Sequence, residues 1–136
     1  MKLVVDANIL ISGLLKNGIT RELMLNRNIN LYTSEYIFEE LFNHLDEISK
    51  KAGMNKNEFK DMTEILIVES DLKNITKNEV QSFTDLANSI SPDADDALYF
   101  ATALKLNCAI WSNDKQLKNQ KHVKVYSTHD LIKLKA

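Results

Sequence analysis

Short apolar runs alternate with longer amphipathic stretches along the chain, and this alternation limits the fold more than any other feature of the sequence. A continuous run such as Leu-Val-Val at residues 3–5 is typical of a strand buried on both faces of a parallel sheet. No two of the runs are joined by a short hairpin turn, so parallel pairing with helical crossovers is expected. The pattern predicts a three-layer α/β/α sandwich around a parallel sheet of about four to five strands. The predicted strands are residues 3–5, 31–33, 72–75, 108–111 and 123–126.

Helical periodicity fills the intervals between these strands. Ser34 is a favoured helix N-cap, and the apolar stripe after it predicts one long helix that ends at Gly53. Thr76–Glu79 has the form of a capping box, and Ser91 with Pro92 resembles the N-cap and first residue of a later helix. The chain is of single-domain size, so one domain over residues 1–136 is expected. The predicted helices are residues 9–15, 20–25, 34–53, 57–68, 76–89, 91–104 and 128–134.

Composition excludes several classes of protein. Apolar residues make up 44% of the chain, and no apolar run approaches the ~18–20 residues that cross a bilayer. Asp6 interrupts the first run too early for a signal peptide, so a cytoplasmic protein without a membrane partner is expected. Cys108 has no partner cysteine and is expected to be a buried, inert thiol. The net charge of −2 argues against wholesale wrapping of nucleic acid, but not against a nuclease whose acids are concentrated in one site.

Two aspartates follow predicted strands. Asp6 comes directly after the first strand, and Asp114 follows Trp111 by three residues. Open parallel sheets place functional groups beyond the carboxyl ends of their strands, so two neighbouring strands would bring these carboxylates to the same rim. Taken alone, either residue could equally be a helix cap or a turn residue.

The segment Ser91–Asp96 concentrates three acids within four residues. Acids in a first helical turn gain only about 0.3–1 kcal/mol each from the helix dipole, and three of them repel one another, so dipole stabilisation explains the set poorly. Asp93 and Asp96 are three residues apart and share a helical face, whereas Asp95 points away. We therefore assign Asp93 and Asp96 to a site and Asp95 to solvent.

The same geometry separates the acids of the predicted helix 34–53. Relative to Leu41, Glu39 points almost opposite the apolar stripe, whereas Glu40 lies at its border and can reach a buried rim. His44 lies one turn beyond Glu40, but an isolated histidine is more often a surface or capping residue, and it is not assigned to catalysis.

Several carboxylates gathered at one rim repel one another by about 4 kcal/mol per pair at ~4 Å and an effective dielectric of 20, and a bound cation removes that cost. Oxygen ligands suit Mg²⁺ or Mn²⁺, and no Cys/His spacing suggests zinc. Such ions activate water and stabilise the leaving oxygen in phosphodiester cleavage.

Four segments together resemble the PIN-domain nucleases, the family that includes many prokaryotic toxins of the VapC type. They are VVDANILIS at the start, SEYIFEELFNHL in the middle, and SPDADDALYFATAL and AIWSNDKQL near the end. Each segment is weak alone, but their order and spacing are specific, and the resemblance covers nearly the whole chain.

The resemblance implies a metal-binding quartet and a set of auxiliary residues. It also implies Mg²⁺ or Mn²⁺ dependence, single-stranded RNA as substrate, and for some members a small antitoxin partner or a homodimer. The implied quartet is Asp6, Glu40, Asp96 and Asp114, with Asp93 as an auxiliary acid and Asn8 and Ser112 as residues that orient an acid or a water.

Phosphate contacts and two rival functions complete the expectations. The candidates for contact with the RNA backbone are Lys16, Arg21, Lys115 and Lys118, each of which could instead be an ordinary solvated side chain. A phosphoryl-transfer enzyme of the haloacid-dehalogenase kind also uses an aspartate after its first strand, but it wants a second acid where this chain has Asn8. The other rival is a non-catalytic module that binds RNA or a protein through the same groove.

Overall fold

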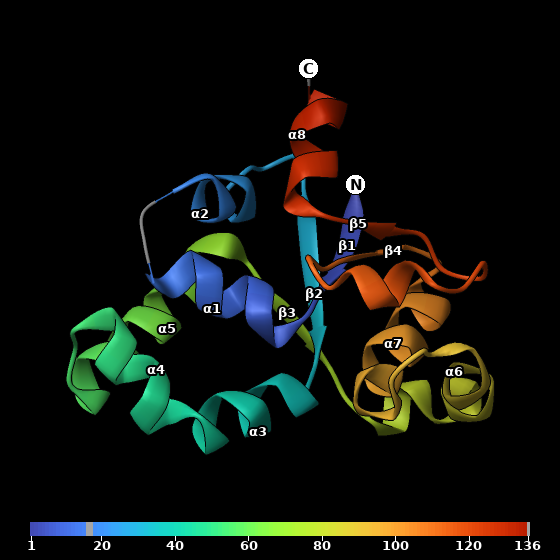
Figure 1. Cartoon of the computed structure of the whole chain (residues 1–136), viewed down its shortest axis with the longest axis horizontal. Coiled ribbons are helices and arrows are strands. Elements are labelled where there is room, and N and C mark those ends of the chain that lie inside the picture. The colour runs from blue at the N-terminus through green and yellow to red at the C-terminus, as the bar shows by residue number, and fades with distance from the viewer. Residues whose placement is uncertain (16–17, 136) are drawn as a thin grey trace.

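Five parallel strands form one central sheet in the computed structural model, which describes residues 1–15 and 18–135. The strand order is β3-β2-β1-β4-β5, so β1 lies in the middle and β4 is its direct neighbour (Figure 1). The parallel sheet and its five strands confirm the predicted fold. The strands are β1 (Lys2–Val5), β2 (Asn30–Ser34), β3 (Lys73–Ile75), β4 (Ala109–Trp111) and β5 (Val125–Tyr126).

Helices cover both faces of the sheet. The group α1 to α5 lies on one side, and α6 and α7 lie on the other (Figure 1). The α-helices are α1 (Ala7–Leu15), α2 (Ile19–Met24), α3 (Tyr36–Asn43), α4 (Leu45–Ala52), α5 (Lys56–Ser70), α6 (Thr84–Ile90), α7 (Ala97–Leu106) and α8 (Thr128–Lys135). Three 3₁₀ segments join them among the described residues: η1 (Asn78–Phe83), η2 (Ala94–Asp96) and η3 (Lys115–Lys118).

The alternation of side chains along β1 divides the core into two layers. Leu3 and Val5 are fully buried in the cluster that packs against α1, α2, α4 and α5. Val4 is buried in the opposite cluster with Phe100 of α7 and Ile110 of β4. A strand whose residues are buried on both faces is the expected result of a Leu-Val-Val run in a covered parallel sheet.

The predicted helix 34–53 is two helices, and this part of the prediction is wrong. The chain turns at His44, whose φ of −110° and ψ of 13° lie outside the helical region, and α4 begins at the next residue. Asn43 and His44 are weak helix formers, so a break here costs little local stability. The turn allows Leu41 and Ile48, which lie on the two helices, to join the same core cluster.

The predicted helix 91–104 begins later than expected. Ser91 is extended, as is usual before proline, and the α-helix α7 begins only at Ala97. Asp93 caps the preceding 3₁₀ segment η2, because its carboxylate accepts the Asp95 N–H at 3.0 Å. The predicted capping box is confirmed by reciprocal bonds between Thr76 and Glu79, although it opens a 3₁₀ segment rather than an α-helix. No helix in the described ranges is long and apolar enough to cross a membrane.

Candidate active site at the carboxyl ends of the strands

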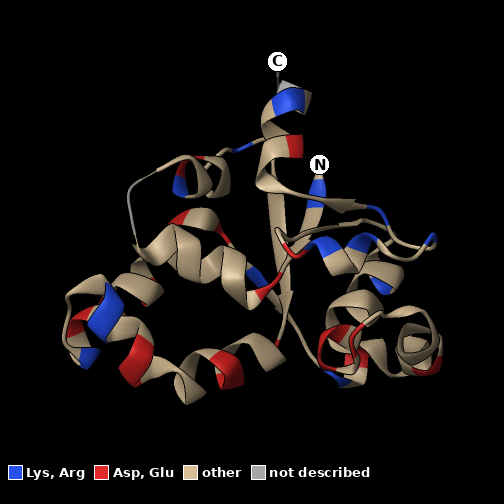
Figure 2. Cartoon of the chain, in the orientation of Figure 1, with Lys and Arg blue, Asp and Glu red and all other residues tan. Residues whose placement is uncertain are grey.

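The site lies where β1 and β4 end side by side. Val5 is in register with Trp111, so Asp6 and the segment that follows Trp111 leave the sheet at the same rim. Asp6 is only 5% exposed, and Ser112 is fully buried beside it. Figure 2 shows acidic segments from several elements around this end of the sheet. β1 and β4 are therefore neighbours, as the convergence of Asp6 and Asp114 requires.

A hydrogen-bond network ties Asp6 to the end of β4. Ser112 donates its hydroxyl proton to Asp6 Oδ2, and the same Ser112 oxygen accepts the Asp114 N–H at 3.1 Å. Asp6 Oδ1 accepts the Ile9 N–H at 3.0 Å, so Asp6 also caps α1. Asp6 can therefore be both a helix cap and a site residue, because Oδ1 caps α1 and Oδ2 takes part in the network with Ser112. Asp114 likewise caps η3 by accepting the Gln116 N–H at 3.0 Å.

Burial raises the pKa of Asp6 above its ordinary value. The hydrogen bonds from Ser112 and Ile9 oppose this shift by stabilising the carboxylate, and the negative charge of Asp114 adds to it. The carboxylate therefore depends on its two donors to remain ionised in a nearly dry position.

Asp96 links the other acids to the same centre. It is half-buried at the junction of η2 and α7. Its pKa is raised from 3.8 to about 7, mainly by burial and in addition by the negative charges of Asp93, Asp6, Asp114 and Glu40. These five acids come from four separate segments of the sequence, and the other four lie close enough to Asp96 to raise its pKa. A cation bound among them would relieve the repulsion.

Glu40 of α3 is half-buried and accepts a hydrogen bond from the Tyr99 hydroxyl, with the two oxygens 3.3 Å apart. Burial raises the pKa of Glu40, the bond from Tyr99 opposes that rise, and the charge of Asp6 adds to it. Sequence reasoning missed Tyr99, which is buried in the first turn of α7, three residues after Asp96. Its spacing from Asp96 was the available signal.

The remaining acids and His44 lie as predicted. Glu39 and Asp95 are exposed. His44 is exposed, and its Nδ1 lies 3.6 Å from Glu47 Oε2. Glu40 and His44 line a hollow of about 280 Å³ next to the centre, and Asn8 lies on its opposite wall on α1. Asn8 therefore lies near Glu40, while its backbone N–H also helps to stabilise the Asp6 carboxylate.

The donor set fits Mg²⁺ or Mn²⁺ better than a metal that needs a closed cage. Within the described residues, no three acidic, histidine or cysteine side chains are close enough to enclose a cation by themselves. Mg²⁺ commonly keeps several waters and takes only one or two carboxylates from the protein. Carboxylate oxygens from several segments that do not form a closed cage match that mode of binding.

The predicted phosphate contacts have different surroundings. Arg21 donates to the carbonyl oxygens of Gly13 and Leu14 at 2.7 and 3.1 Å, which gives it a structural role at the end of α1. Lys118 forms an ion pair with Asp130 at 2.6 Å, and Lys115 is exposed. Lys16 lies outside the described residues. Phosphate binding by these four side chains stays a prediction.

Cys108 is half-buried rather than buried. Burial raises the pKa of its thiol to about 11, so the thiolate is scarce at neutral pH. The inert character expected of this residue is retained.

Comparison with known proteins agrees with the architecture. A family model described as the PIN domain matches residues 4–130. The chain is similar to a chain of the crystal structure of VapBC2 from Rickettsia felis bound to a DNA fragment from their promoter, with a TM-score of 0.72 and 15% sequence identity. The match covers 93% of this chain and 98% of that chain, and at this identity it shows the fold alone. No curated protein sequence matches the chain significantly.

Proposed function

The chain belongs to the PIN-domain family of nucleases, and on that premise we propose that it hydrolyses phosphodiester bonds of single-stranded RNA with Mg²⁺ or Mn²⁺. The observation that carries this proposal is the raised pKa of Asp96, which is caused by burial and by four other acids around one polar space. Perturbed carboxylates that converge on a strand-end rim are typical of a catalytic site.

We assign Asp6, Asp96 and Asp114 to direct binding of one or two divalent ions, and Glu40 and Asp93 to a second ion or to a water. When bound, such an ion activates water for in-line attack and stabilises the leaving oxygen. The chain's own contribution is to hold these carboxylates in position around the ion.

Two neutral residues do that holding. Ser112 fixes the Asp6 carboxylate and the backbone of Asp114 through one hydroxyl group. Tyr99 fixes Glu40 from α7, the helix that begins directly after Asp96. Both residues orient acids rather than touch the reacting phosphate, and we therefore regard them as positioning residues.

Cleavage of a mixed-sequence single-stranded RNA, with Mg²⁺, with Mn²⁺ and with EDTA, tests the proposal. The proteins are the wild type, Asp96→Asn, and Asp95→Asn as a matched control that changes an exposed neighbour by the same atoms. We expect metal-dependent cleavage by the wild type and the control, and none by Asp96→Asn. If all three folded proteins are equally inert with both metals, the non-catalytic module becomes the better account.

We also propose that the protein is the cytoplasmic toxin of a toxin–antitoxin pair, since it shares its fold with a chain of a VapBC2 structure. Induced expression should then arrest bacterial growth, and Asp96→Asn should abolish the arrest. Capture on the folded Asp96→Asn protein would identify a small antitoxin. Growth unaffected by an enzyme that is active in vitro would contradict the toxin role but not the nuclease.

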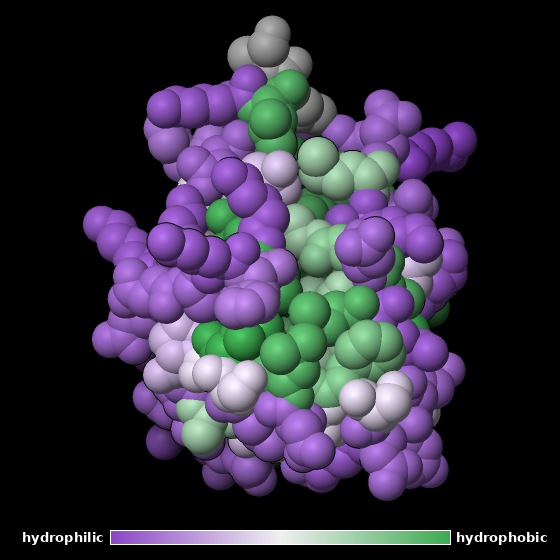
Figure 3. Space-filling model, turned by 90° about the vertical axis from the view of Figure 1, so that its right-hand side faces the viewer, coloured by the Kyte–Doolittle hydropathy of each residue, from purple (hydrophilic) through white to green (hydrophobic). Residues whose placement is uncertain are grey.

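A homodimer is proposed on the basis of exposed apolar surface. Ile65 and Val68 lie three apart on α5 and are 56% and 77% exposed. A second apolar area, bordered by hydrophilic side chains, lies on the side of α6 and α7 (Figure 3). Apolar areas that stay exposed on a folded chain often mark protein contacts. Light scattering should give twice the chain mass for the wild type and the single mass for Val68→Glu.

A further inference from the structure

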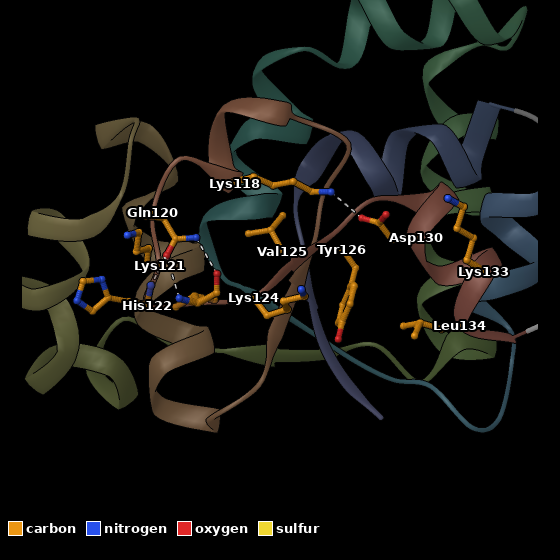
Figure 4. Close-up of a pocket in the computed structure, with 11 residues that line it drawn as sticks. Lys118, Gln120, Lys121, His122, Lys124, Val125, Tyr126, Asp130, Lys133 and Leu134 are labelled. Atoms are coloured by element: carbon orange, nitrogen blue, oxygen red, sulfur yellow. Dashed lines mark hydrogen bonds and ion pairs between the residues drawn. The ribbon is translucent and has the colours of Figure 1, made fainter.

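A basic hollow of about 740 Å³ lies outside the acidic centre, between the loop after η3, the edge strand β5 and α8 (Figure 4). Its charged lining is almost entirely cationic. Of its lysines, Lys118 is paired with Asp130, the acid in the lining. Lys121, Lys124 and Lys133 form no ion pair with any described residue. Three lysines without an ion pair among the described residues therefore line one open cavity.

This charge is concentrated against the trend of the whole chain. From Lys115 to His129 the sequence contains four lysines and no acidic residue, whereas the net charge of the protein is −2. Local excess positive charge attracts polyanions even when the whole molecule is slightly acidic.

The loop that presents these lysines is held in one shape. The Gln120 side chain donates to the carbonyl oxygens of Leu117 and Val123 at 3.0 and 2.7 Å. Its oxygen accepts the N–H groups of His122 and Val123 at 2.9 and 2.8 Å. A side chain that makes four bonds to its own loop fixes the backbone on both sides of Lys121. The hollow is therefore formed before any ligand binds, which lowers the entropic cost of binding.

An aromatic ring lies among the cations. Tyr126 is half-buried on β5, and Lys124 Nζ lies 5.6 Å from the centre of its ring. Both side chains line the hollow (Figure 4). A positively charged groove that follows a backbone, with an aromatic ring on which a base stacks, is the combination used by proteins that bind single strands.

The hollow is joined to the acidic centre by one short element. Asp114 caps η3, and η3 ends at Lys118, which lines the hollow. At a rise of about 2.0 Å per residue, the four residues of η3 span about 8 Å. An RNA strand that is bound at the acidic centre therefore needs only a few nucleotides to reach the hollow.

We propose that this hollow binds the sugar–phosphate backbone of single-stranded RNA next to the cleaved bond, with a base stacked on Tyr126. The proposal rests on the proposed nuclease function and specifies its substrate as a strand that extends several nucleotides beyond the acids. Lysines also protect exposed edge strands from pairing with other chains, and that alternative predicts no change in RNA affinity.

Fluorescence anisotropy with a labelled 16-nucleotide single-stranded RNA, in EDTA so that nothing is cleaved, tests the proposal. The variant is the triple Lys121→Gln, Lys124→Gln, Lys133→Gln. The control is Lys50→Gln, Lys60→Gln, Lys73→Gln, which removes the same charge elsewhere. Lys73 resembles Lys124 in lying 5.6 Å from a tyrosine ring, that of Tyr32, toward the other edge of the sheet, but it is also paired with Asp71 at 3.9 Å.

Each lost phosphate contact lowers the slope of log affinity against log salt by about 0.7, so the variant should show a slope about two units shallower than the wild type. The control should keep the wild-type slope. Tyr126→Phe should bind normally and Tyr126→Leu more weakly. A variant that binds like the wild type, or a control that loses as much, overturns the proposal. The proposal is also overturned if polyglutamate binds as tightly as RNA and Tyr126→Leu has no effect, since the hollow would then suit an acidic peptide.

A cleavage arm separates this inference from the proposed function. With metal present, the triple variant should raise KM for the 16-nucleotide RNA and leave cleavage of a 4-nucleotide RNA unchanged. If the wild type cleaves both RNAs and the variant matches it on both, only the inference fails. If the wild type cleaves neither RNA but its binding still depends on the three lysines, the nuclease function fails and the hollow remains an RNA site.

Discussion

Replacing Ser112 by alanine removes the hydroxyl group that joins Asp6 to Asp114. The variant loses a charge-assisted hydrogen bond to Asp6 Oδ2 and leaves that oxygen almost dry, since Asp6 is only 5% exposed. Bonds to charged groups contribute about 1.5–3 kcal/mol, so the free energy of unfolding of the metal-free protein should fall by about that amount at pH 8. With a urea m-value of about 2 kcal/mol/M, the midpoint should fall by roughly 1 M.

The effect of Ser112→Ala should depend on pH, and its sign follows from the Asp6 carboxylate. Ser112 lowers the pKa of Asp6 against the raising effect of burial, so the folded variant has a higher Asp6 pKa than the folded wild type. The stabilisation that Ser112 provides is present above both values and is lost as pH falls through them. Urea unfolding at pH 8 and at pH 4.5 should therefore show a smaller difference between the two proteins at the lower pH.

Ser49→Ala is the matched control for this experiment. Ser49 is also buried, but its hydroxyl donates to the neutral carbonyl oxygen of Asp46 at 3.1 Å. Its loss should cost about 0.5–1.5 kcal/mol at either pH. Equal, pH-independent losses for the two variants would refute the charge-assisted role of Ser112.

Three further results are expected. The pKa of Asp96 in the folded protein, about 7, exceeds its ordinary 3.8, so the stability of the metal-free protein should fall as pH rises from about 4 to 7. Mg²⁺ must displace the proton of Asp96, so the rise in melting temperature caused by Mg²⁺ should be larger at pH 8 than at pH 5.5. Equal rises at the two pH values would contradict the site. Tyr99→Phe removes the donor to Glu40, so the acidic limb of the pH–rate profile should move to higher pH while unfolding free energy changes by only about 1 kcal/mol; an unmoved profile argues against this positioning role. Trp111→Ala should cost about 3–5 kcal/mol in urea unfolding because the ring is fully buried, whereas Phe42→Ala, 61% exposed, should cost under about 1 kcal/mol, and similar losses would disprove the assigned core.

Sequence periodicity was sufficient for the central strands, because β1 and β4 are short apolar runs in a covered parallel sheet. β3 reads Lys-Asn-Ile and is largely exposed, so apolar periodicity supports that strand only weakly. The rule that functional groups follow strand ends identified Asp6 and Asp114 before the strand order was known. The order itself, with β4 beside β1, depends on pairing between segments about 100 residues apart. Only the structure shows that Ser112 connects the two acids.

Local signals failed where packing decided the backbone. No Gly or Pro marks the break at His44, which follows from the need of α3 and α4 to reach the same core. At Pro92 the cap signal was real but misplaced, because Asp93 took the capping role two residues later. Tyr99 was missed because its hydroxyl finds Glu40 across 59 residues of sequence.

Metal-assisted hydrolysis by the acidic centre is tested by cleaving single-stranded RNA in oxygen-18 water and analysing the products by mass spectrometry. If water attacks at this centre, we expect one oxygen-18 atom in each newly formed phosphate, no 2′,3′-cyclic phosphate, and no product from Asp96→Asn. Cyclic phosphate that forms equally with wild type and Asp96→Asn would show that the neighbouring ribose hydroxyl attacks instead, and would contradict metal-assisted hydrolysis by these carboxylates.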